Sequence, residues 1–438
     1  MFRKIKAYIS DFLKSDTQKV LIIDGARQVG KSYIIREAGT ELFENYVEIN
    51  LLEDSLNNRY FANTKSTSDF YLQLSMIAGD RLKEKENTLI FLDEIQAYPH
   101  LLTLLKFLNQ DNRFTYIASG SLLGITLSQT SSIPMGSIEV KQMYPMDFEE
   151  FLIANNFGEL AISALKEKFK KRETLEENIH NNLLGLFKKY LLSGGLPDAV
   201  KTFVETNNIV SVRTIQNQIH EYYGMDASKY DLEHKLKIKR IYDMIPSTLE
   251  NKKKRIVVQD IENKKGKRFS SYQDEFDYLI NAGVALEVKA ISTPVFPLNE
   301  HSGKNLLKLY LNDVGILSGI LYQNNIRAIL DSENSINLGT LYEAVVAQEL
   351  KAHGKQLFYY DNKSKGEVDF LINDYDSLSI LPIEVKSGKD YSVHSALNSF
   401  LQNKDYNVSN AIVFSNERIV TTTPAGITYL PIYYVMGL

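Results

Sequence analysis

Apolar residues in the first third of the chain occur in short runs that are separated by helix-like stretches. The runs have the length and composition of strands buried on both faces, and the first is followed by residues with helical spacing at 32–37. Alternating strands and helices predict a doubly wound α/β domain with a parallel sheet, which we expect to span residues 1–153. The predicted strands lie at residues 19–23, 46–50, 88–92 and 114–118.

The segment directly after the first strand, residues 25–32, matches the phosphate-loop pattern G-x-x-x-x-G-K-[ST] at every position. Its glycines allow backbone N–H groups to face phosphate oxygens, and the helix that follows adds the positive end of its dipole. We expect Lys31 to act at the β- and γ-phosphates during catalysis and Ser32 to bind Mg²⁺. The predicted nucleotide-binding residues of the loop are Gly25, Ala26, Arg27, Gln28, Val29, Gly30, Lys31 and Ser32.

Two acidic residues end the predicted strand at 88–92, which is the Walker B form. Asp93 is expected to hold Mg²⁺, and Glu94 is placed to orient or deprotonate the attacking water. The next strand leads into Ser119, which would lie at the carboxyl end of the parallel sheet, where ligands of open α/β folds bind. Ser119 is therefore a candidate γ-phosphate or water sensor, although a turn or a helix cap would also explain it.

Five segments together resemble a family of prokaryotic AAA-type ATPases in which a C-terminal domain of unknown function follows the ATPase. The resemblance implies an AAA-like P-loop core and ATP as the nucleotide. The residues themselves do not distinguish ATP from GTP, because no N-K-x-D-like base reader is evident in the sequence. AAA-type ATPases usually carry an arginine finger, for which Arg27, Arg113 and Arg213 are open alternatives. The segments that carry the resemblance are residues 25–32, 92–96, 119–123, 144–151 and 194–197.

Residues 154–231 show helical periodicity and predict a helical subdomain. Between residues 234 and 268 the chain carries twelve Lys or Arg against four Asp or Glu, in contrast to a net charge of −4 for the whole chain. Helix-like residues 237–249, an extended segment at 255–258 and a second helix at 271–282 fit a winged-helix-like domain over 232–330. The family resemblance suggests the same domain. The basic residues of 235–268 make DNA or RNA a candidate partner, whereas a solvated charged surface is the alternative.

The last hundred residues predict an amphipathic helix at 341–350, strands at 366–372 and 381–386, and a further apolar strand. Side chains alternate along a strand, so Asp369, Glu384 and Lys386 can converge across a hairpin. Two carboxylates and a lysine suit Mg²⁺-assisted phosphodiester hydrolysis: Asp369 and Glu384 would hold the metal, and Lys386 would activate water or neutralise developing charge. Glu343 could complete the metal set from the helix. The order resembles the restriction-endonuclease-like superfamily, which we expect over 331–438.

The amino-acid composition excludes several kinds of site and of targeting segment. The chain has no Cys, which excludes disulfides, thiolate zinc sites and cysteine nucleophiles and fits a reducing compartment. No apolar stretch of 18 residues and no signal-like segment is present, so we expect a cytoplasmic protein without a membrane partner.

The leading hypothesis is an ATP-hydrolysing switch that controls a nucleic-acid-directed nuclease module, with ATP and Mg²⁺ as cofactors. The alternative is a nucleotide-regulated binding or scaffold protein whose nuclease-like domain no longer cuts. A small-molecule kinase is disfavoured, because Glu94 suits water as the nucleophile.

Overall fold

The structure, a computed structural model, describes residues 1–438 apart from residue 16, residues 125–135, 228–233, 299–305 and 332–337, and residues 363, 389, 407 and 409. It divides into two compact units, the first comprising residues 1–144 with 281–283 and the second residues 145–280 with 284–438. The division into four domains stays a prediction, and its boundary at 231/232 lies outside the described residues. No helix within the described ranges is long and apolar enough to cross a membrane.

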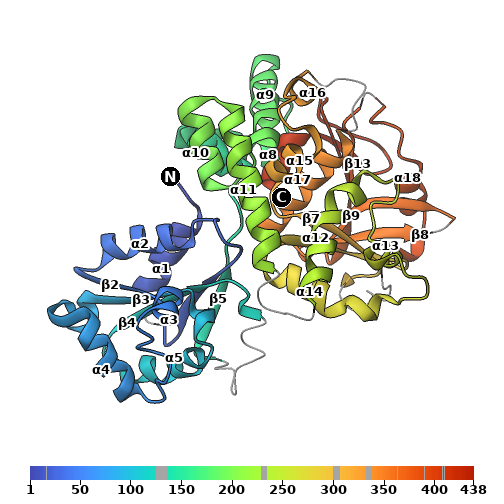
Figure 1. The fold of residues 1–438 in the computed structure, drawn as a ribbon. Coiled ribbons are helices and arrows are strands. Elements are labelled where there is room, and N and C mark those ends of the chain that lie inside the picture. Colours follow the sequence, from blue (N-terminus) through green and yellow to red (C-terminus); the bar gives the residue numbers. More distant parts are fainter. Residues whose placement is uncertain are drawn as a thin grey trace. The chain divides into compact units, whose positions relative to one another are not determined.

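Unit 1 is a parallel sheet with the strand order β2-β3-β4-β1-β5 and helices on both faces (Figure 1). Its strands are β1 (Val20–Asp24), β2 (Asn45–Asn50), β3 (Thr88–Asp93), β4 (Thr115–Gly120) and β5 (Ile138–Gln142). Its helices are α1 (Ile5–Lys14), α2 (Lys31–Leu42), α3 (Leu51–Leu56), α4 (Thr67–Ala78) and α5 (His100–Asp111), with short 3₁₀ turns at Gly79–Arg81, Lys85–Asn87 and Ile95–Ala97. The parallel P-loop fold expected from the sequence is therefore confirmed.

The two faces of this sheet are covered by different helices because alternate residues of each strand point to opposite sides. Val20 and Ile22 of β1 belong to a core formed with residues of α4 and α5. On the opposite side Gly39 of α2 lies so close to β2 and β3 that a Cβ there would be 2.8 Å from the Tyr46 ring and 2.9 Å from the Leu89 side chain. Both faces are thus sealed, and the polar strand ends are left to form a site.

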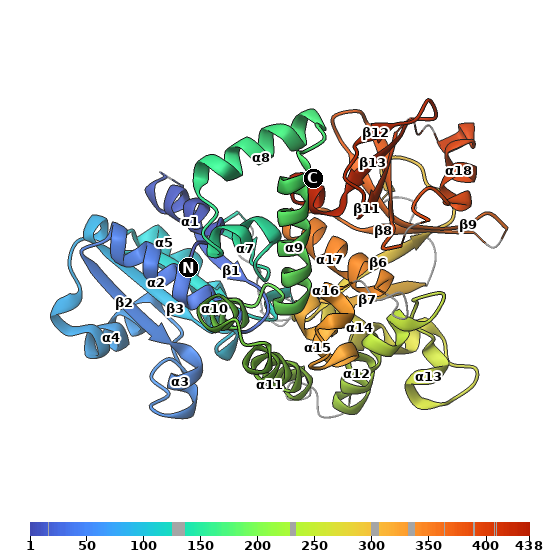
Figure 2. The same ribbon diagram turned by 90° about the horizontal axis from the view of Figure 1, so that it is seen from above.

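Unit 2 contains a helical region followed by an eight-stranded sheet of order β12-β13-β11-β10-β9-β8-β6-β7 (Figure 2). The helices before the sheet are α7 (Phe148–Ala154), α8 (Glu159–Lys171), α9 (Glu177–Ser193), α10 (Pro197–Thr206), α11 (Ile209–Ala227), α12 (Lys235–Glu250), α13 (Val258–Glu262) and α14 (Gln273–Asn281), with a 3₁₀ turn at Phe269–Tyr272. The strands are β6 (Ala285–Ile291), β7 (Leu307–Leu311), β8 (Phe358–Asn362), β9 (Gly366–Asp374), β10 (Ser379–Val385), β11 (Ala411–Ser415), β12 (Thr421–Thr422) and β13 (Ile427–Pro431). The remaining elements are α15 (Val314–Tyr322), α16 (Arg327–Leu330), α17 (Gly339–Ala352), α18 (Ser395–Leu401) and 3₁₀ turns at Lys404–Tyr406 and Ile432–Gly437.

The middle of the chain differs from the sequence prediction in one segment. Residues 255–258 were expected to be extended, but no strand forms there and a short helix begins at Val258. The two flanking helices are present as α12 and α14. The hairpin of β6 and β7 that follows also pairs with β8, so these strands belong to the sheet that continues to β13. The winged-helix-like domain stays a prediction.

The C-terminal elements follow the predicted order. β9 and β10 pair as an antiparallel hairpin, as expected, with Ile383 opposite Phe370. The helix expected at 341–350 exists as α17, but it is buried on all sides rather than amphipathic, because its residues from Thr340 to Leu350 are all buried. It packs against α15, β6, β7 and β10 of the same unit, which leaves it no exposed face.

Candidate functional site

The phosphate loop connects β1 to α2 in unit 1. Gly30 precedes the first residue of α2 with φ 94°, a left-handed conformation that glycine adopts without strain. Gly25 lies against the backbone at residue 143, where a Cβ would be only 2.2 Å from the Met143 carbonyl oxygen. No larger residue fits at Gly25, so the loop can form only with glycine there.

Lys31 is the first residue of α2 and is buried in the loop. Its ammonium donates hydrogen bonds of 2.8 Å to the carbonyl oxygens of Gly25 and Ala26. Burial lowers its pKa, and the nearby carboxylates of Glu94, Asp24 and Asp93 oppose that shift. Lys31 is therefore a desolvated cation bonded to its own loop. To contact a phosphate, its ammonium would have to leave these carbonyl oxygens.

Strands β3 and β4 bring Asp93 and Ser119 to the start of α2, where Asp93 contacts Ser32. The Ser32 hydroxyl donates a 2.8 Å hydrogen bond to Oδ2 of Asp93, and the Ser119 hydroxyl donates to Oδ1 of the same carboxylate. Burial raises the pKa of Asp93, whereas its bonds from the two serines lower it. A serine hydroxyl beside a carboxylate at the start of a helix is the oxygen set that Mg²⁺ takes in P-loop proteins. These residues fit a Mg²⁺–nucleotide complex.

Glu94 follows β3 in a left-handed backbone conformation, with φ 56° and ψ 48°. One carboxylate oxygen lies 3.9 Å from the guanidinium of Arg27 in the phosphate loop and accepts a hydrogen bond from the side-chain amide of Gln96. The Gln96 amide in turn contacts Ser121 just beyond β4. Gln96 was not among the site residues predicted from the sequence. Its position two residues after Glu94 was the sequence feature that could have identified it.

The three arginines considered as fingers have different surroundings. Arg27 lies beside Glu94, and Arg113 stacks 4.4 Å from the centre of the Tyr71 ring. Arg213 is buried in unit 2, where it donates to backbone carbonyl oxygens including those of Leu192 and Gly315. Arg213 therefore has a local structural role.

The four predicted C-terminal residues come together in unit 2. Oδ2 of Asp369 accepts a 2.8 Å bond from the backbone N–H of Val385, and Lys386 donates a 2.8 Å bond to Oε1 of the buried Glu384. Burial raises the pKa of Asp369 well above its usual value, and the negative charges of Glu384 and Glu343 raise it further. Side chains on β9, β10 and α17 thus form one electrostatic cluster.

Two lysines that were not predicted as site residues offset the negative charge of this cluster. Lys308 of β7 is fully buried, and its ammonium lies 2.5 Å from Oε1 of Glu367. Lys254 forms an ion pair with Glu343, which also accepts a 3.2 Å hydrogen bond from Tyr310. A single charge in the apolar run of β7 was a signal for Lys308. Only the fold brings Lys254 to this cluster.

The donors available for a metal ion in the cluster are the carboxylates of Asp369 and Glu384. Oε2 of Glu384 is buried and has no hydrogen-bond partner among the described residues. No group of three or more His, Asp or Glu side chains in the described part of the chain could hold a metal ion. A pair of carboxylates still fits Mg²⁺, which commonly keeps several waters and binds through one or two carboxylates plus phosphate.

The predicted basic surface is partly compensated by acidic neighbours. Lys237 lies 3.4 Å from Glu275, and Arg255 lies 3.3 Å from Asp361. Among the lysines and arginines of this segment whose burial the structure describes, eight are exposed: Lys239, Arg240, Lys252, Lys253, Lys264, Lys265, Lys267 and Arg268.

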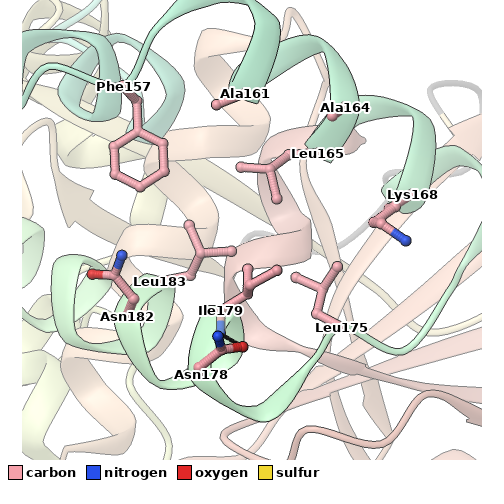
Figure 3. Close-up of a pocket in the computed structure, with 10 residues that line it drawn as sticks. All are labelled: Phe157, Ala161, Ala164, Leu165, Lys168, Leu175, Asn178, Ile179, Asn182 and Leu183. Carbon is pink, nitrogen blue, oxygen red and sulfur yellow. Dashed lines mark hydrogen bonds between the residues drawn. The ribbon is translucent and has the colours of Figure 1, made fainter.

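A hollow of about 370 Å³ lies between α8 and α9 of unit 2 (Figure 3). Its lining is mainly apolar, with Phe157, Leu165 and Leu183 pointing into it and Lys168 at one end (Figure 3). None of the predicted site residues lines it, and it contains no pair of groups suited to catalysis.

Comparison with known protein families divides the chain into three matched segments. Residues 17–152 match the sequence model of an AAA domain. Residues 184–328 match a domain of unknown function, DUF8612, and residues 338–435 match a second, DUF4143. A comparison with proteins of curated function gives no match.

Solved structures that match this chain include the Walker-type ATPase PABY2304 of Pyrococcus abyssi, with 12% identity over 72% of this chain and 95% of that chain, at a TM-score of 0.45. Cdc6p from Pyrobaculum aerophilum has 11% identity over 75% of this chain and 92% of that chain, at a TM-score of 0.26. AMPPCP-bound DnaA from Aquifex aeolicus has 11% identity over 64% and 87%, at a TM-score of 0.29. These TM-scores all lie below 0.5 and do not establish a shared overall fold.

Proposed function

We propose, from the AAA-type ATPase domain at residues 17–152, that ATP binding and hydrolysis in this protein switch a nucleic-acid-directed, Mg²⁺-dependent nuclease centre in unit 2. The observation that carries the ATPase part is the contact of Ser32 and Ser119 with the Asp93 carboxylate at the amino end of α2. This contact joins Ser32 of the phosphate loop, Asp93 as the proposed metal ligand and Ser119 as the proposed sensor.

Different residues of unit 1 bind the phosphates, hold Mg²⁺ and orient the attacking water. The N–H groups of the phosphate loop and Lys31 hold the β- and γ-phosphates, and Ser119 monitors the γ-phosphate from the end of β4. Bound Mg²⁺, held by Ser32 and Asp93, supplies charge neutralisation at these phosphates. Glu94, which is partly exposed, orients the attacking water and accepts its proton.

The nuclease part of the proposal rests on the cluster of Asp369, Glu384 and Lys386. The two carboxylates would hold Mg²⁺, and the Lys386 ammonium is placed to orient water or to offset charge that develops on a phosphate. Glu343 would join them when its ion pair with Lys254 opens. The exposed lysines and arginines of residues 235–268 would contact the phosphate backbone of DNA or RNA.

A second candidate function is a nucleotide-regulated binding or scaffold protein whose cluster does not cut. The ion pairs of Lys254 with Glu343 and of Lys386 with Glu384 favour it, because each neutralises a carboxylate that a metal ion would otherwise compensate. In that case the cluster stabilises the sheet, and the exposed basic residues bind nucleic acid or an acidic protein. Under both functions we propose a cytoplasmic location, consistent with the absence of Cys.

The test is incubation of the whole protein with plasmid, linear and single-stranded DNA and with RNA, in Mg²⁺ or Mn²⁺, with and without ATP. Lys386→Ala is the test variant, and Lys365→Ala, at an exposed lysine in the turn between β8 and β9, is the matched control. Cutting that only Lys386→Ala abolishes supports the nuclease. ATP turnover without cutting by the unaltered protein contradicts the nuclease and supports the binding function.

A further inference from the structure

Gln96 forms a bridge between Glu94 and the end of β4. It is only 7% exposed and lies in the 3₁₀ turn Ile95–Ala97 directly after Glu94. Its Nε2 donates to the Glu94 carboxylate and lies 3.2 Å from the Ser121 hydroxyl, and its Oε1 accepts a 3.2 Å bond from the Ser121 backbone N–H. All three contacts lie within unit 1.

The chemistry of these partners determines the orientation of the amide. A backbone N–H can only donate, so Oε1 of Gln96 must face Ser121, and an ionised carboxylate can only accept, so Nε2 must face Glu94. The glutamine amide provides an acceptor at one atom and donors at the other, which matches these two partners. A glutamate of the same shape would place a second negative charge against Glu94.

The backbone supports this close approach on both sides of the amide. Gly120, the last residue of β4, lies so near that a Cβ there would be 2.9 Å from Oε1 of Gln96. Glu94 itself has a left-handed backbone that is uncommon for a residue with a long side chain, and such conformations gather at functional sites. The backbone at Gly120 and Glu94 therefore holds the Gln96 amide between Glu94 and the end of β4.

The carboxyl end of β4 and the residue after it consequently contact both acids at the carboxyl end of β3, Asp93 and Glu94. Ser119 bonds Asp93 directly, whereas Ser121 reaches Glu94 through Gln96. A displacement of this strand end on contact with a γ-phosphate would reach the Mg²⁺ ligand and the water-orienting carboxylate together.

We propose that Gln96 is a positioning residue for hydrolysis, which holds the Glu94 carboxylate toward the attacking water and links its position to residues 119–121. The inference rests on the proposed ATPase function and deepens it. Because Gln96 is buried and bonds Glu94 and Ser121, it is expected to act on turnover through Glu94 and not on nucleotide affinity.

Two variants at this position separate a positioning role from a structural one. Gln96→Glu keeps the shape of the side chain and its bond from Ser121 but replaces the donor to Glu94 with a carboxylate. Gln96→Ala removes all three contacts. Gln110→Ala, at an exposed glutamine of α5 in the same unit, is the matched control.

We would measure kcat and KM for ATP, the Kd of a fluorescent ATP analogue and the melting temperature of each variant. Both Gln96 variants are expected to lower kcat by about 10-fold to 100-fold, the range seen when a partner that orients a catalytic ligand is lost. Their nucleotide Kd should stay within about twofold of the unaltered protein, and Gln96→Glu should keep its melting temperature, because the amide acts after binding. The control should be unchanged.

Unchanged kcat in Gln96→Glu, while the unaltered protein turns over ATP, would overturn the role of Gln96 and leave the ATPase intact. Parallel losses of melting temperature and nucleotide affinity in Gln96→Glu would also overturn it, since they mark a purely structural amide. No turnover in the unaltered protein would overturn the ATPase function and this inference with it. If Gln96→Ala does not fold, Ser121→Ala supplies the second variant, with a smaller loss of kcat expected because the backbone bond remains.

Discussion

At the scale of single residues, Glu94 and Lys31 differ in how the protein holds them. Lys31 is buried and bonded to the carbonyl oxygens of its own loop, whereas Glu94 stands partly exposed between Arg27 and Gln96. A buried cation bound to carbonyls suits the binding of phosphates, and a partly exposed carboxylate suits contact with water. The two residues are thus expected to affect different steps.

Glu94→Gln should retain ATP binding and slow hydrolysis by about 100-fold or more, because the amide cannot accept the proton of the attacking water. Retention of radiolabelled ATP on the variant, measured beside steady-state turnover, checks both parts. Turnover equal to that of the unaltered protein would remove Glu94 from this role.

At the scale of secondary-structure elements, β7, β9 and α17 are held together by compensating charges. Burial lowers the pKa of Lys308, but Glu367, Glu343 and Asp369 together raise it above its usual value. The ammonium is therefore charged at neutral pH. Its removal would leave carboxylates in the interior without their counter-charge.

Lys308→Met should destabilise unit 2 by about 3–5 kcal/mol, the usual cost of removing one partner of a buried ion pair. The double variant with Glu367→Gln should recover part of that loss, because the uncompensated carboxylate is removed as well. Chemical denaturation of both single variants and the double variant measures the coupling. Strictly additive losses would show that the two side chains do not stabilise each other.

A second element-scale feature is Asp313, which caps α15. Its carboxylate accepts bonds from the backbone N–H groups of Gly195 and Ile316, and burial raises its pKa to about 6. The folded state therefore holds this proton more tightly than the unfolded chain does. Stability from this group is complete below pH about 4, the usual pKa of Asp, and is lost as the pH rises through 6.

The unaltered protein should lose free energy of unfolding between pH about 4 and 6 as Asp313 gives up its proton. Asp313→Asn should make this loss shallower, because a single group contributes at most about 1.4 kcal/mol per pH unit to the slope. Denaturation curves at several pH values for both proteins check the prediction. Equal slopes in the two proteins would mean that other groups dominate this pH range.

At the scale of the whole molecule, the proposed function requires nucleotide state in unit 1 to control unit 2. Lys31→Ala should abolish nucleotide binding or turnover, and with it any effect of ATP on nucleic-acid binding or cleavage. Lys83→Ala, at an exposed lysine of unit 1, is the matched control. ATPase activity, nucleic-acid affinity and cleavage would be measured on each protein with and without ATP.

Undiminished ATPase activity in Lys31→Ala would contradict the site assignment. If ATPase activity is lost but ATP still changes nucleic-acid binding, the coupling does not depend on hydrolysis at this loop. Loss of both effects together is the expected result.

The parts of this protein that local sequence patterns could predict are those in which neighbours along the chain decide the structure. The phosphate loop, the strands that end in Asp93 and Ser119, and the hairpin of β9 and β10 are of this kind. Their apolar runs, glycines and turn residues specify a strand, a loop or a helix start within about ten residues. Helices α8 to α11 were predictable for the same reason.

Only the tertiary structure decided which distant groups meet. Lys254 and Lys308 lie 89 and 59 positions from Glu343 and Glu367 along the chain, so no local pattern could pair them. The amphipathic helix expected at 341–350 is instead buried throughout, because neighbouring elements cover its polar side as well as its apolar one.

The amino-acid sequence by itself determined the phosphate loop and the strand ends beside it, since glycine conformation and side-chain alternation act over a few residues. The tertiary structure decided how Gln96 bridges Glu94 and Ser121, and how lysines balance the carboxylates of unit 2. Those contacts depend on the packing of whole strands, which brings together charges and hydrogen-bonding groups that are far apart in sequence.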